Sequence, residues 1–479
     1  MGIDLGTTNT KVALVETSSS AVRVRAVASA PTPAPADLAV TVSALLRRVM
    51  DGAPAPDVVG IASMAETGVP LDASGVPIGD WLRWDGHRAV VEAEDLSHRL
   101  GWTALVAATG VRPSAKVPLA TWAWLRTHRP GTWSAMARWA GAADLAGRLL
   151  TGRLATDHTL AGRTMAYRLP SPGAALPGGF DAELLGDVGL RPEQLPDVVT
   201  GGIAGRVSDP AFGLPLGTPV VIAGHDHAVG AYAAGVRQPG DVADSLGTAE
   251  AIMSVVAIPP DPIEVARAGM SAVVTVGGVH RAVLAGSSTA GAVVRWWLEH
   301  ESGGIDADEL FAQVQNLGDR PTEVLVLPYL SGRQAPDPDP SARLRIIGRS
   351  DQSPAYLARA MLEGLCLHAR WIAREQFRLA GLVAPPVTVL GRPVVANPAW
   401  IRVKAQVMPW PLRLVTEPEA VAAGAALLAA ERAGLVSPAP ALDQRPAPTP
   451  GGADYDESFA RFVAAAQNAD VTRPTRIPE

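Results

Sequence analysis

Residues 4–11, which read DLGTTNTK, constrain the possible folds of this chain more than any other segment. Alternating apolar and polar residues around them predict a hairpin that runs into a third strand before about residue 30. Gly6 at the turn can adopt positive backbone angles, and Thr7 and Thr8 add hydroxyls to a row of amide donors that can cradle phosphate oxygens. Taken alone, the turn is equally compatible with an ordinary tight hairpin whose threonines serve strand propensity.

Polar residues flank this turn on both sides. Asp4 precedes it and could hold a magnesium ion through water, because Mg²⁺ keeps several waters and needs few protein carboxylates. Asn9 and Lys11 follow the turn, and Lys11 is one of only three lysines in an arginine-dominated chain. Its charge suits a phosphate contact, although a solvated strand residue explains it equally well. The segment therefore predicts a site for phosphates and Mg²⁺.

A similar pattern returns about half a chain later. Residues 240–252 read GDVADSLGTAEAI and place Gly247 and Thr248 at a second turn between apolar strands. A chain of 479 residues also exceeds what one hydrophobic core usually serves. We therefore expect two related lobes, residues 1–238 with the first phosphate loop and residues 239–479 with the second.

The rest of the chain alternates helical and strand patterns, which is typical of layered α/β domains. Two proline-rich stretches, 30–36 and 436–450, are expected to be loops, because proline lacks the amide donor that a helix or central strand needs. The residue patterns predict strands at 58–62, 219–223, 324–327, 387–390 and 412–415, and helices at 133–150, 353–377, 397–407, 417–430 and 455–466.

Composition narrows the classes of function. The formal net charge is −6, and no basic cluster is present, so neither nucleic acid nor a membrane surface is an expected partner. Cys366 is the only cysteine, which excludes an intramolecular disulfide and suggests a reducing compartment. With the phosphate-loop pattern at the first residues, no room is left for a signal peptide, and we expect a cytoplasmic protein. The first strand has few residues before Gly2, so the natural start is expected to lie upstream.

Asp226 is the main catalytic candidate. It follows the apolar strand that ends in Gly224, and ligands bind at the carboxyl ends of strands in open α/β sheets. An aspartate there could accept the proton of a hydroxyl that attacks a γ-phosphate. The alternative is an N-cap for the following helix. His225 and His227 also raise the possibility of a metal site, but two alternating histidines lack a visible third ligand.

Together these segments resemble the FGGY family of carbohydrate kinases over nearly the whole chain. The resemblance implies two actin-like (ribonuclease H-like) ATPase lobes with a cleft between them, with the sugar site in residues 1–238 and the nucleotide site in residues 239–479. It also implies ATP and Mg²⁺ as cofactors, and a sugar or polyol as substrate. Homodimers are common among such kinases. The matching segments are GIDLGTTNTK, AGHDHAVGAYAAG, GDVADSLGTAEAI, AGSSTAGAVVRWW, LPYLSGRQAPDPDPSAR and EPEAVAAGAALLAA.

The resemblance assigns roles to individual residues. Asp4 and the turn after it would meet Mg²⁺ and the outer phosphates, Asp226 would be the base, and residues 391–397 would receive adenosine. That last segment reads GRPVVAN, whereas the family usually has adjacent glycines there. The residues expected to bind the nucleotide are Asp4, Gly6, Thr7, Thr8, Asn9, Lys11, Gly247, Thr248, Gly291, Gly391 and Asn397.

The expected substrate contacts depart further from the family. Glu66 and Thr67 resemble the glycerol-kinase pair, but Ala65 stands where those kinases have arginine. The segment WLRWDGHRA resembles a tryptophan-asparagine-aspartate-x-arginine motif shifted in register, and a packed aromatic loop with a surface arginine is the alternative. The substrate contacts expected from the resemblance are Glu66, Thr67, Trp84, Asp85, Arg88, His225 and Asp226.

Two other functions compete with a kinase. The start of the chain also resembles heat-shock-chaperone ATPases, but those need a glycine-rich second loop and a separate peptide-binding domain. A degenerate kinase that senses a sugar without turnover would explain the altered adenosine segment, although the chain has no DNA-reading module to pass on a signal. Ketoses, alditols and aldonates all remain open as substrates.

Overall fold

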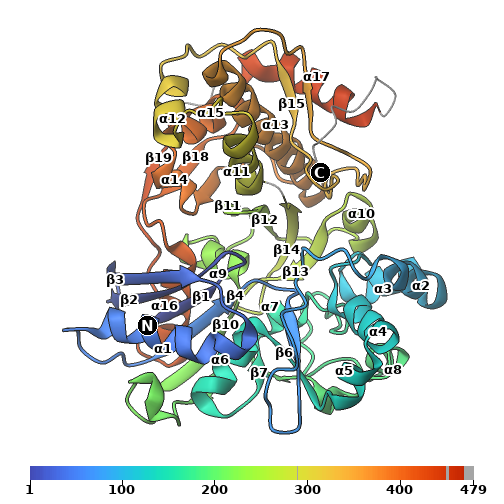
Figure 1. Cartoon of the computed structure of the whole chain (residues 1–479), viewed down its shortest axis with the longest axis vertical. Coiled ribbons are helices and arrows are strands. Elements are labelled where there is room, and N and C mark those ends of the chain that lie inside the picture. Colours follow the sequence, from blue (N-terminus) through green and yellow to red (C-terminus); the bar gives the residue numbers. More distant parts are fainter. Residues whose placement is uncertain (289, 449–451, 469–479) are drawn as a thin grey trace.

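The computed structural model describes residues 1–288, 290–448 and 452–468 of the chain. They form two α/β lobes, one above the other in Figure 1, each built on a mixed sheet with helices against it. This architecture confirms the two-lobed α/β fold expected from the sequence. No helix in the described ranges has both the length and the apolar character needed to cross a membrane.

The first sheet carries the DLGTTNTK turn and confirms the predicted hairpin with its third strand. Strand β1 pairs antiparallel with β2, which pairs antiparallel with β3. On its other side β1 pairs in parallel with β4, and β4 pairs in parallel with β10. The strand order is β3 (Val22–Pro31), β2 (Asn9–Thr17), β1 (Gly2–Leu5), β4 (Val59–Ser63), β10 (Pro219–His225) and β9 (Gly205–Arg206).

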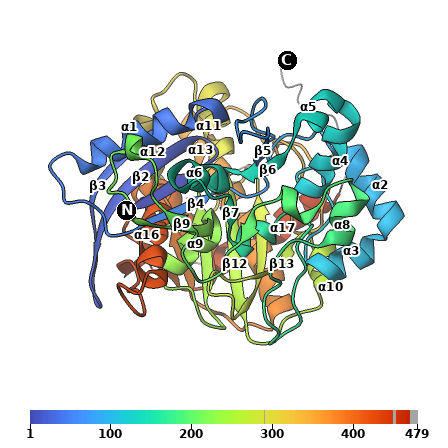
Figure 2. The same cartoon turned by 90° about the horizontal axis from the view of Figure 1, so that it is seen from below.

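Helix α16 (Ala420–Arg432) belongs to the first sheet by packing, although it lies in the second half of the sequence. It packs against β1, β2, β4 and β10, on the face opposite to α1 (Leu38–Met50) and α6 (Ala142–Thr151), as Figure 2 shows. A Cβ atom on Gly2 would lie 1.8 Å from the Ala422 carbonyl oxygen, so glycine permits this close approach. Together with α9 (Asp226–Ala233), α16 shares an apolar cluster with strands of both sheets. The expected division at residue 238 stays a prediction. Helix α16 follows that residue in the sequence but packs against the sheet that precedes it.

A helical layer with its own core adjoins the first sheet. The single helix expected over residues 133–150 is wrong in part, because the end of α5, strand β6 and helix α6 occupy this range. Helix α5 ends at Ala135, and the next residues form β6, which pairs antiparallel with β5. Partners some 70 residues earlier in the chain thus override local helical patterning. The elements of this layer and its connections are β5 (Gly68–Leu71), α2 (Val90–Leu100), α3 (Trp102–Thr109), α4 (Pro118–His128), α5 (Pro130–Ala135), β6 (Arg138–Gly141), β7 (Ala155–Thr156), α7 (His158–Ala161), α8 (Ala182–Asp187), β8 (Asp197–Val198) and the 3₁₀ turn Pro192–Gln194. The 3₁₀ turns Pro35–Asp37 and Pro210–Phe212 pack against α1.

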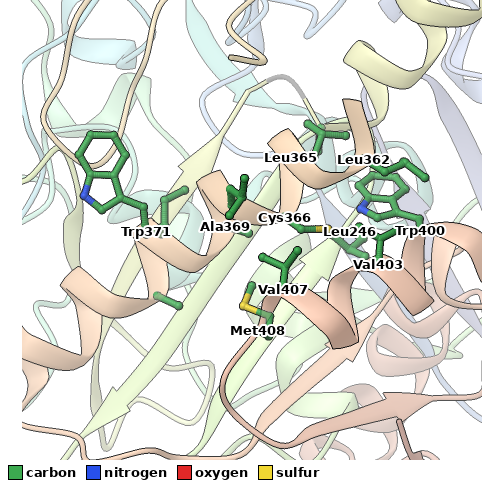
Figure 3. Packing of buried hydrophobic residues seen from close by; sticks show 14 of the residues in the cluster. Leu246, Leu362, Leu365, Cys366, Ala369, Trp371, Trp400, Val403, Val407 and Met408 are labelled. Atoms are coloured by element: carbon green, nitrogen blue, oxygen red, sulfur yellow. The ribbon is translucent and has the colours of Figure 1, made fainter. Parts of the chain in front are cut away.

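The second sheet carries the echo of the first turn, between β11 and β12. The long helix α13 packs against it and against α15, and Figure 3 shows Cys366 of α13 and Leu246 of β11 facing Val403 and Trp400 of α15. The strand order is β13 (Ser271–Val274), β14 (Arg281–Ser287), β12 (Glu250–Val256), β11 (Val242–Leu246), β17 (Val387–Leu390), β18 (Leu412–Val415) and β19 (Gln444–Pro446).

Most predicted elements of the second half occur within a few residues of their expected bounds. The loop expected at 436–450 is wrong in part, because β19 lies within it and pairs with β18 at the sheet edge, where proline is tolerated. The predicted terminal helix is present as α17. The remaining elements are α10 (Pro262–Arg267), α11 (Ala290–His300), α12 (Ala307–Gln315), β15 (Leu325–Leu327), β16 (Arg345–Ile347), α13 (Pro354–Ala380), α14 (Pro393–Ala396), α15 (Pro398–Val407), the 3₁₀ turn Ala453–Tyr455 and α17 (Asp456–Gln467).

Candidate active site

A cavity of about 570 Å³ lies where the two lobes meet. Because β1, β4 and β10 run in parallel, their carboxyl ends at Leu5, Ser63 and His225 open on the same edge of the first sheet. Residues after β11 and β17 of the second sheet line the other side. This volume is within the range of small-molecule sites, and the position is the one that open α/β sheets use for ligands.

The first turn faces this cavity with a buried carboxylate behind it. Burial raises the pKa of Asp4 to about 7, the negative charges of Asp226 and Glu419 act in the same direction, and Lys11 opposes them. The Oδ1 atom of Asp4 is buried without a hydrogen-bond partner among the described residues. Lys11 lies 2.6 Å from Glu419 of the segment before α16. An acceptor oxygen in this setting can be satisfied by a hydrated cation.

Gly6, Thr7, Thr8 and Asn9 also line the cavity. The Thr7 hydroxyl accepts a hydrogen bond from Trp84 Nε1 at 2.8 Å, which ties the turn to the loop after β5. Thr8 Oγ1 lies 3.2 Å from Thr248 Oγ1, so the two hydroxyl-bearing turns face each other across the lobes.

The second turn is supported by the first residues of α11. The Gly291 amide donates to the Gly247 carbonyl oxygen at 3.1 Å, and a Cβ atom on Gly291 would lie 2.5 Å from that oxygen. Glycine is therefore required at this position for the helix to approach the turn. Gly247, Thr248 and Gly291 all line the cavity.

Asp226 is the first residue of α9 and lines the cavity. The N-cap position is His225, and its side chain makes no capping bond, so the N-cap interpretation of Asp226 is wrong. Asp226 Oδ1 accepts the His227 amide at 2.7 Å. Burial raises the pKa of Asp226, as does the charge of Glu66, while His227 opposes the shift. A carboxylate with a raised pKa in a cavity is a better proton acceptor than an ordinary surface aspartate.

The two histidines beside Asp226 differ in their contacts. His225 Nε2 lies 3.2 Å from Asp226 Oδ1, and His227 Nδ1 lies 3.1 Å from Ser245 Oγ in the second lobe. Burial and the charges of His227, Arg163 and Lys116 hold the pKa of His225 well below its ordinary value. The third potential metal ligand that was not visible in the sequence is Asp226 itself, since ligand atoms of all three lie within 4.8 Å. A metal bound there would occupy the carboxylate that a base needs.

Glu66 lies in the cavity wall with two cations that were not expected. Arg163 Nη2 donates to Glu66 Oε1 at 2.5 Å, and Lys116 Nζ lies 3.6 Å from Oε2. Burial alone would raise the pKa of Glu66, but the charges of Arg163 and Lys116 hold it below its ordinary value. Glu66 adopts φ 61°, a region that non-glycine residues seldom occupy and that is enriched at functional sites.

Of the remaining expected substrate contacts, one lines the cavity and the others do not. Trp84 lines the cavity, and buried Thr67 accepts the Trp84 amide at 3.1 Å from beneath it without lining the cavity. Asp85 and Arg88 do not line it either. Asp85 accepts two 3.1 Å bonds from Arg83, and Arg88 stacks 5.8 Å over the Trp124 ring. Trp84 of this loop lines the cavity, whereas Trp81 is buried in the core of the first sheet, so the packed-loop alternative describes Trp81 and Arg88.

The segment expected to receive adenosine also lines the cavity, at Gly391, Arg392, Pro393, Ala396 and Asn397. Gly391 adopts φ 107°, and a Cβ atom there would lie 2.1 Å from the Leu246 carbonyl oxygen. The bulky residues that follow form one helical turn, and Asn397 caps α15 through the Trp400 amide at 3.0 Å. Gly391 thus permits the close approach of this segment to the end of β11, and its role in binding adenosine stays a prediction.

Comparison with known proteins bears on this arrangement. The model of the FGGY family of carbohydrate kinases, N-terminal domain, matches residues 1–233, and its C-terminal domain matches residues 242–433. The chain belongs to the FGGY family of carbohydrate kinases. This confirms the resemblance found in the sequence and the expected enzyme class, a phosphotransferase with an alcohol acceptor. The chaperone and sensor alternatives are not favoured.

Several curated relatives differ in substrate. This kinase is 30% identical to L-fuculokinase of Haemophilus influenzae over 45% of its chain and 44% of the relative. It is 28% identical to glycerol kinase of Alkalilimnicola ehrlichii over 80% and 78% of the two chains. A xylulose kinase of Streptomyces rubiginosus is 34% identical over 44% and 43%. The fuculokinase and xylulose kinase matches thus span less than half of those relatives.

Solved structures share the fold of this kinase. A ligand-bound xylulose kinase from Lactobacillus acidophilus has a TM-score of 0.82 at 19% identity, over 97% of this chain and 96% of that one. Glycerol kinase of Plasmodium falciparum with ADP has a TM-score of 0.80 at 16% identity, over 98% of both. At these identities the likeness concerns the fold alone.

Proposed function

We propose that this kinase transfers the γ-phosphoryl group of ATP to a hydroxyl of a small sugar or polyol, with Asp226 as the base. The observation that carries the proposal is the position of Asp226, which lies partly buried just after the end of β10, in a cavity lined by both hydroxyl-bearing turns. Phosphoryl transfer needs little covalent chemistry from a protein beyond positioning, charge stabilisation and a proton acceptor.

The residues of the first turn fit Mg²⁺. The unpartnered Oδ1 of Asp4 is a buried acceptor beside the phosphate-binding turns, and Mg²⁺ prefers one or two carboxylates together with waters and phosphates. Bound Mg²⁺ would neutralise charge on the phosphate oxygens. Asp4 would hold it through water, and its pKa would fall in the presence of the cation.

The two turns would bind the phosphates from opposite sides. Thr8 and Thr248, whose hydroxyls are 3.2 Å apart, would separate and donate to phosphate oxygens between them. Gly391 and the helical turn after it would receive adenosine. Meeting of the lobes would exclude water, which otherwise competes as the phosphoryl acceptor.

On the acceptor side, Asp226 would take the proton of the attacking hydroxyl. Its raised pKa suits that task, and neutral His225 beside it can accept or donate a hydrogen bond to a substrate hydroxyl. Trp84 would present an apolar ring to the carbon skeleton, held in place by Thr7 and Thr67. These contacts position a hydroxyl without specifying which sugar carries it.

A coupled ADP assay over ketoses, alditols and aldonates tests this function. We expect ADP release that depends on one acceptor class, and a fall in kcat of about 10²- to 10⁴-fold in Asp226→Asn, which keeps the shape but not the basicity. Asp85→Asn, outside the cavity lining, is the matched control and should retain activity. Normal turnover in Asp226→Asn, or acceptor-independent ATP hydrolysis alone, would contradict the proposal.

A further inference from the structure

The wall that faces the acceptor carries more positive than negative charge. Glu66 is the carboxylate that contacts Lys116 and Arg163, and both cations line the cavity with it. The side chains of Glu66 and Arg163 are each 7% exposed, whereas Lys116 is 24% exposed and borders the open space. Among the described residues, Glu66 is the one carboxylate that pairs with either cation, so this group carries one positive charge in excess.

Arg163 also has an unused donor. Its Nη1 is buried and has no hydrogen-bond partner within the described ranges, while Nη2 is committed to Glu66. Arginine remains charged in proteins, and a buried donor left unpaired is costly, so an acceptor that came within reach of this atom would be stabilised.

Neighbouring groups do not offset this charge. Asp226 also lines the cavity; burial raises its pKa, and the charges that act on it are those of His227, which lowers it, and Glu66, which raises it, rather than those of Lys116 or Arg163. His225 is held neutral. Burial lowers the pKa of Lys116, Glu66 opposes this shift, and the charges of Arg163 and of Arg112, in the same loop, act in the same direction as burial. Glu66 is therefore the one negative charge, against the two positive charges of Arg163 and Arg112, among the charges that shift the pKa of Lys116.

We propose that the acceptor substrate carries a carboxylate, bound by Lys116 and Arg163, so that this kinase selects polyhydroxy carboxylates of the aldonate class over neutral sugars and alditols. This inference rests on the proposed phosphotransfer at the same cavity. A monoanion matches the single surplus charge, whereas a phosphate monoester would bring about −1.5 to −2. Arginine and lysine donors to a carboxylate also form stronger hydrogen bonds than those to a hydroxyl.

Matched acceptor pairs test this selectivity. The kcat/KM for an aldonate should exceed that of the alditol with the same stereochemistry by at least about tenfold, for example gluconate against glucitol or xylonate against xylitol. Lys116→Met should lower kcat/KM for the aldonate by about 10- to 100-fold through KM, with the KM for ATP unchanged. Lys116→Arg should keep the preference, and Arg126→Met, an exposed cation outside the cavity, should keep both preference and rate. Equal or better use of alditols and ketoses would overturn the inference while the kinase function stands.

Binding measured apart from turnover separates the two proposals. In Asp226→Asn, calorimetric titration with gluconate and glucitol should show binding of gluconate only, lost in the double variant with Lys116→Met. If no acceptor releases ADP from the wild-type protein but this difference in binding remains, the proposed phosphotransfer fails and the anion site stands. Equal binding of the two ligands, or a raised KM for ATP in Lys116→Met with every acceptor, would assign the cations to another role and overturn the inference.

Discussion

Each of the three lysines of this chain lies against at least one carboxylate. Apart from the histidines, all other basic side chains are arginines. Lys11 and Lys116 border the cavity, paired with Glu419 and Glu66. Lys404 of α15 is fully buried, and its Nζ lies 2.6 Å from both Asp244 and Glu250. Those two acids lie on β11 and β12, on either side of the second phosphate-binding turn. Lys404 therefore holds together the base of that turn.

Replacement of Lys404 by methionine tests this role. The change should lower the free energy of unfolding by about 3–5 kcal/mol, because it leaves two buried acids without their cation. Arg402→Met is the matched control on the same helix, since its pair with Asp319 is solvent-exposed and should contribute under about 1 kcal/mol. Urea denaturation measures both. Equal losses in the two variants would show that the buried cluster does not depend on Lys404.

At the scale of elements, glycines in the first sheet set the distance to α16. A Cβ atom on Gly60 would lie 1.9 Å from the backbone oxygen of Ala425, which no side-chain rotation can relieve. We expect Gly60→Ala to destabilise the protein by about 1–3 kcal/mol or more through forced separation of helix and sheet. Gly131→Ala in α5, where no atom lies within 4 Å of the new Cβ, should be neutral or slightly stabilising. Thermal unfolding distinguishes the two, and a Gly60→Ala protein as stable as wild type would contradict the packing argument.

The elements that the sequence predicted well are those whose signal is local. Strands such as Val387–Leu390 and helices such as α13 show their burial pattern within one segment. The range 133–150 failed because β6 exists only through its pairing with distant β5.

The residues of the candidate site were likewise predicted where their signal is local and missed where it is not. Its turns and Asp226 lie at strand ends that a short motif reveals. Lys116 and Arg163 were missed because they follow no local motif and meet Glu66 only in the folded chain; the rarity of lysine was the one signal that pointed to Lys116.

At the scale of the whole molecule, the two lobes are not two consecutive halves of the chain. After the second sheet is largely complete, the chain returns at α16 to cover the first sheet, as the red-orange helix beside β1 and β4 in Figure 1 shows. Ala422, Ala425 and Ala429 of this helix are fully buried. The cavity lies between the two lobes, which α16 connects, so the shape of the cavity depends on α16 staying packed against the first sheet.

A fragment experiment follows from this connectivity. Residues 1–238 alone should unfold without a cooperative transition, because the sheet face with Gly2 and Gly60 lacks its helix and exposes apolar surface. Residues 417–436, appended through a flexible glycine-serine linker of about 20 residues, should restore a cooperative transition and reduce binding of a hydrophobic dye. The same fusion with Ala425→Asp is the control, since a buried charge at the contact should abolish the gain. If residues 1–238 alone unfolded as cooperatively as the fusion, the first lobe would be complete without α16, and the crossing helix would serve only to join the lobes.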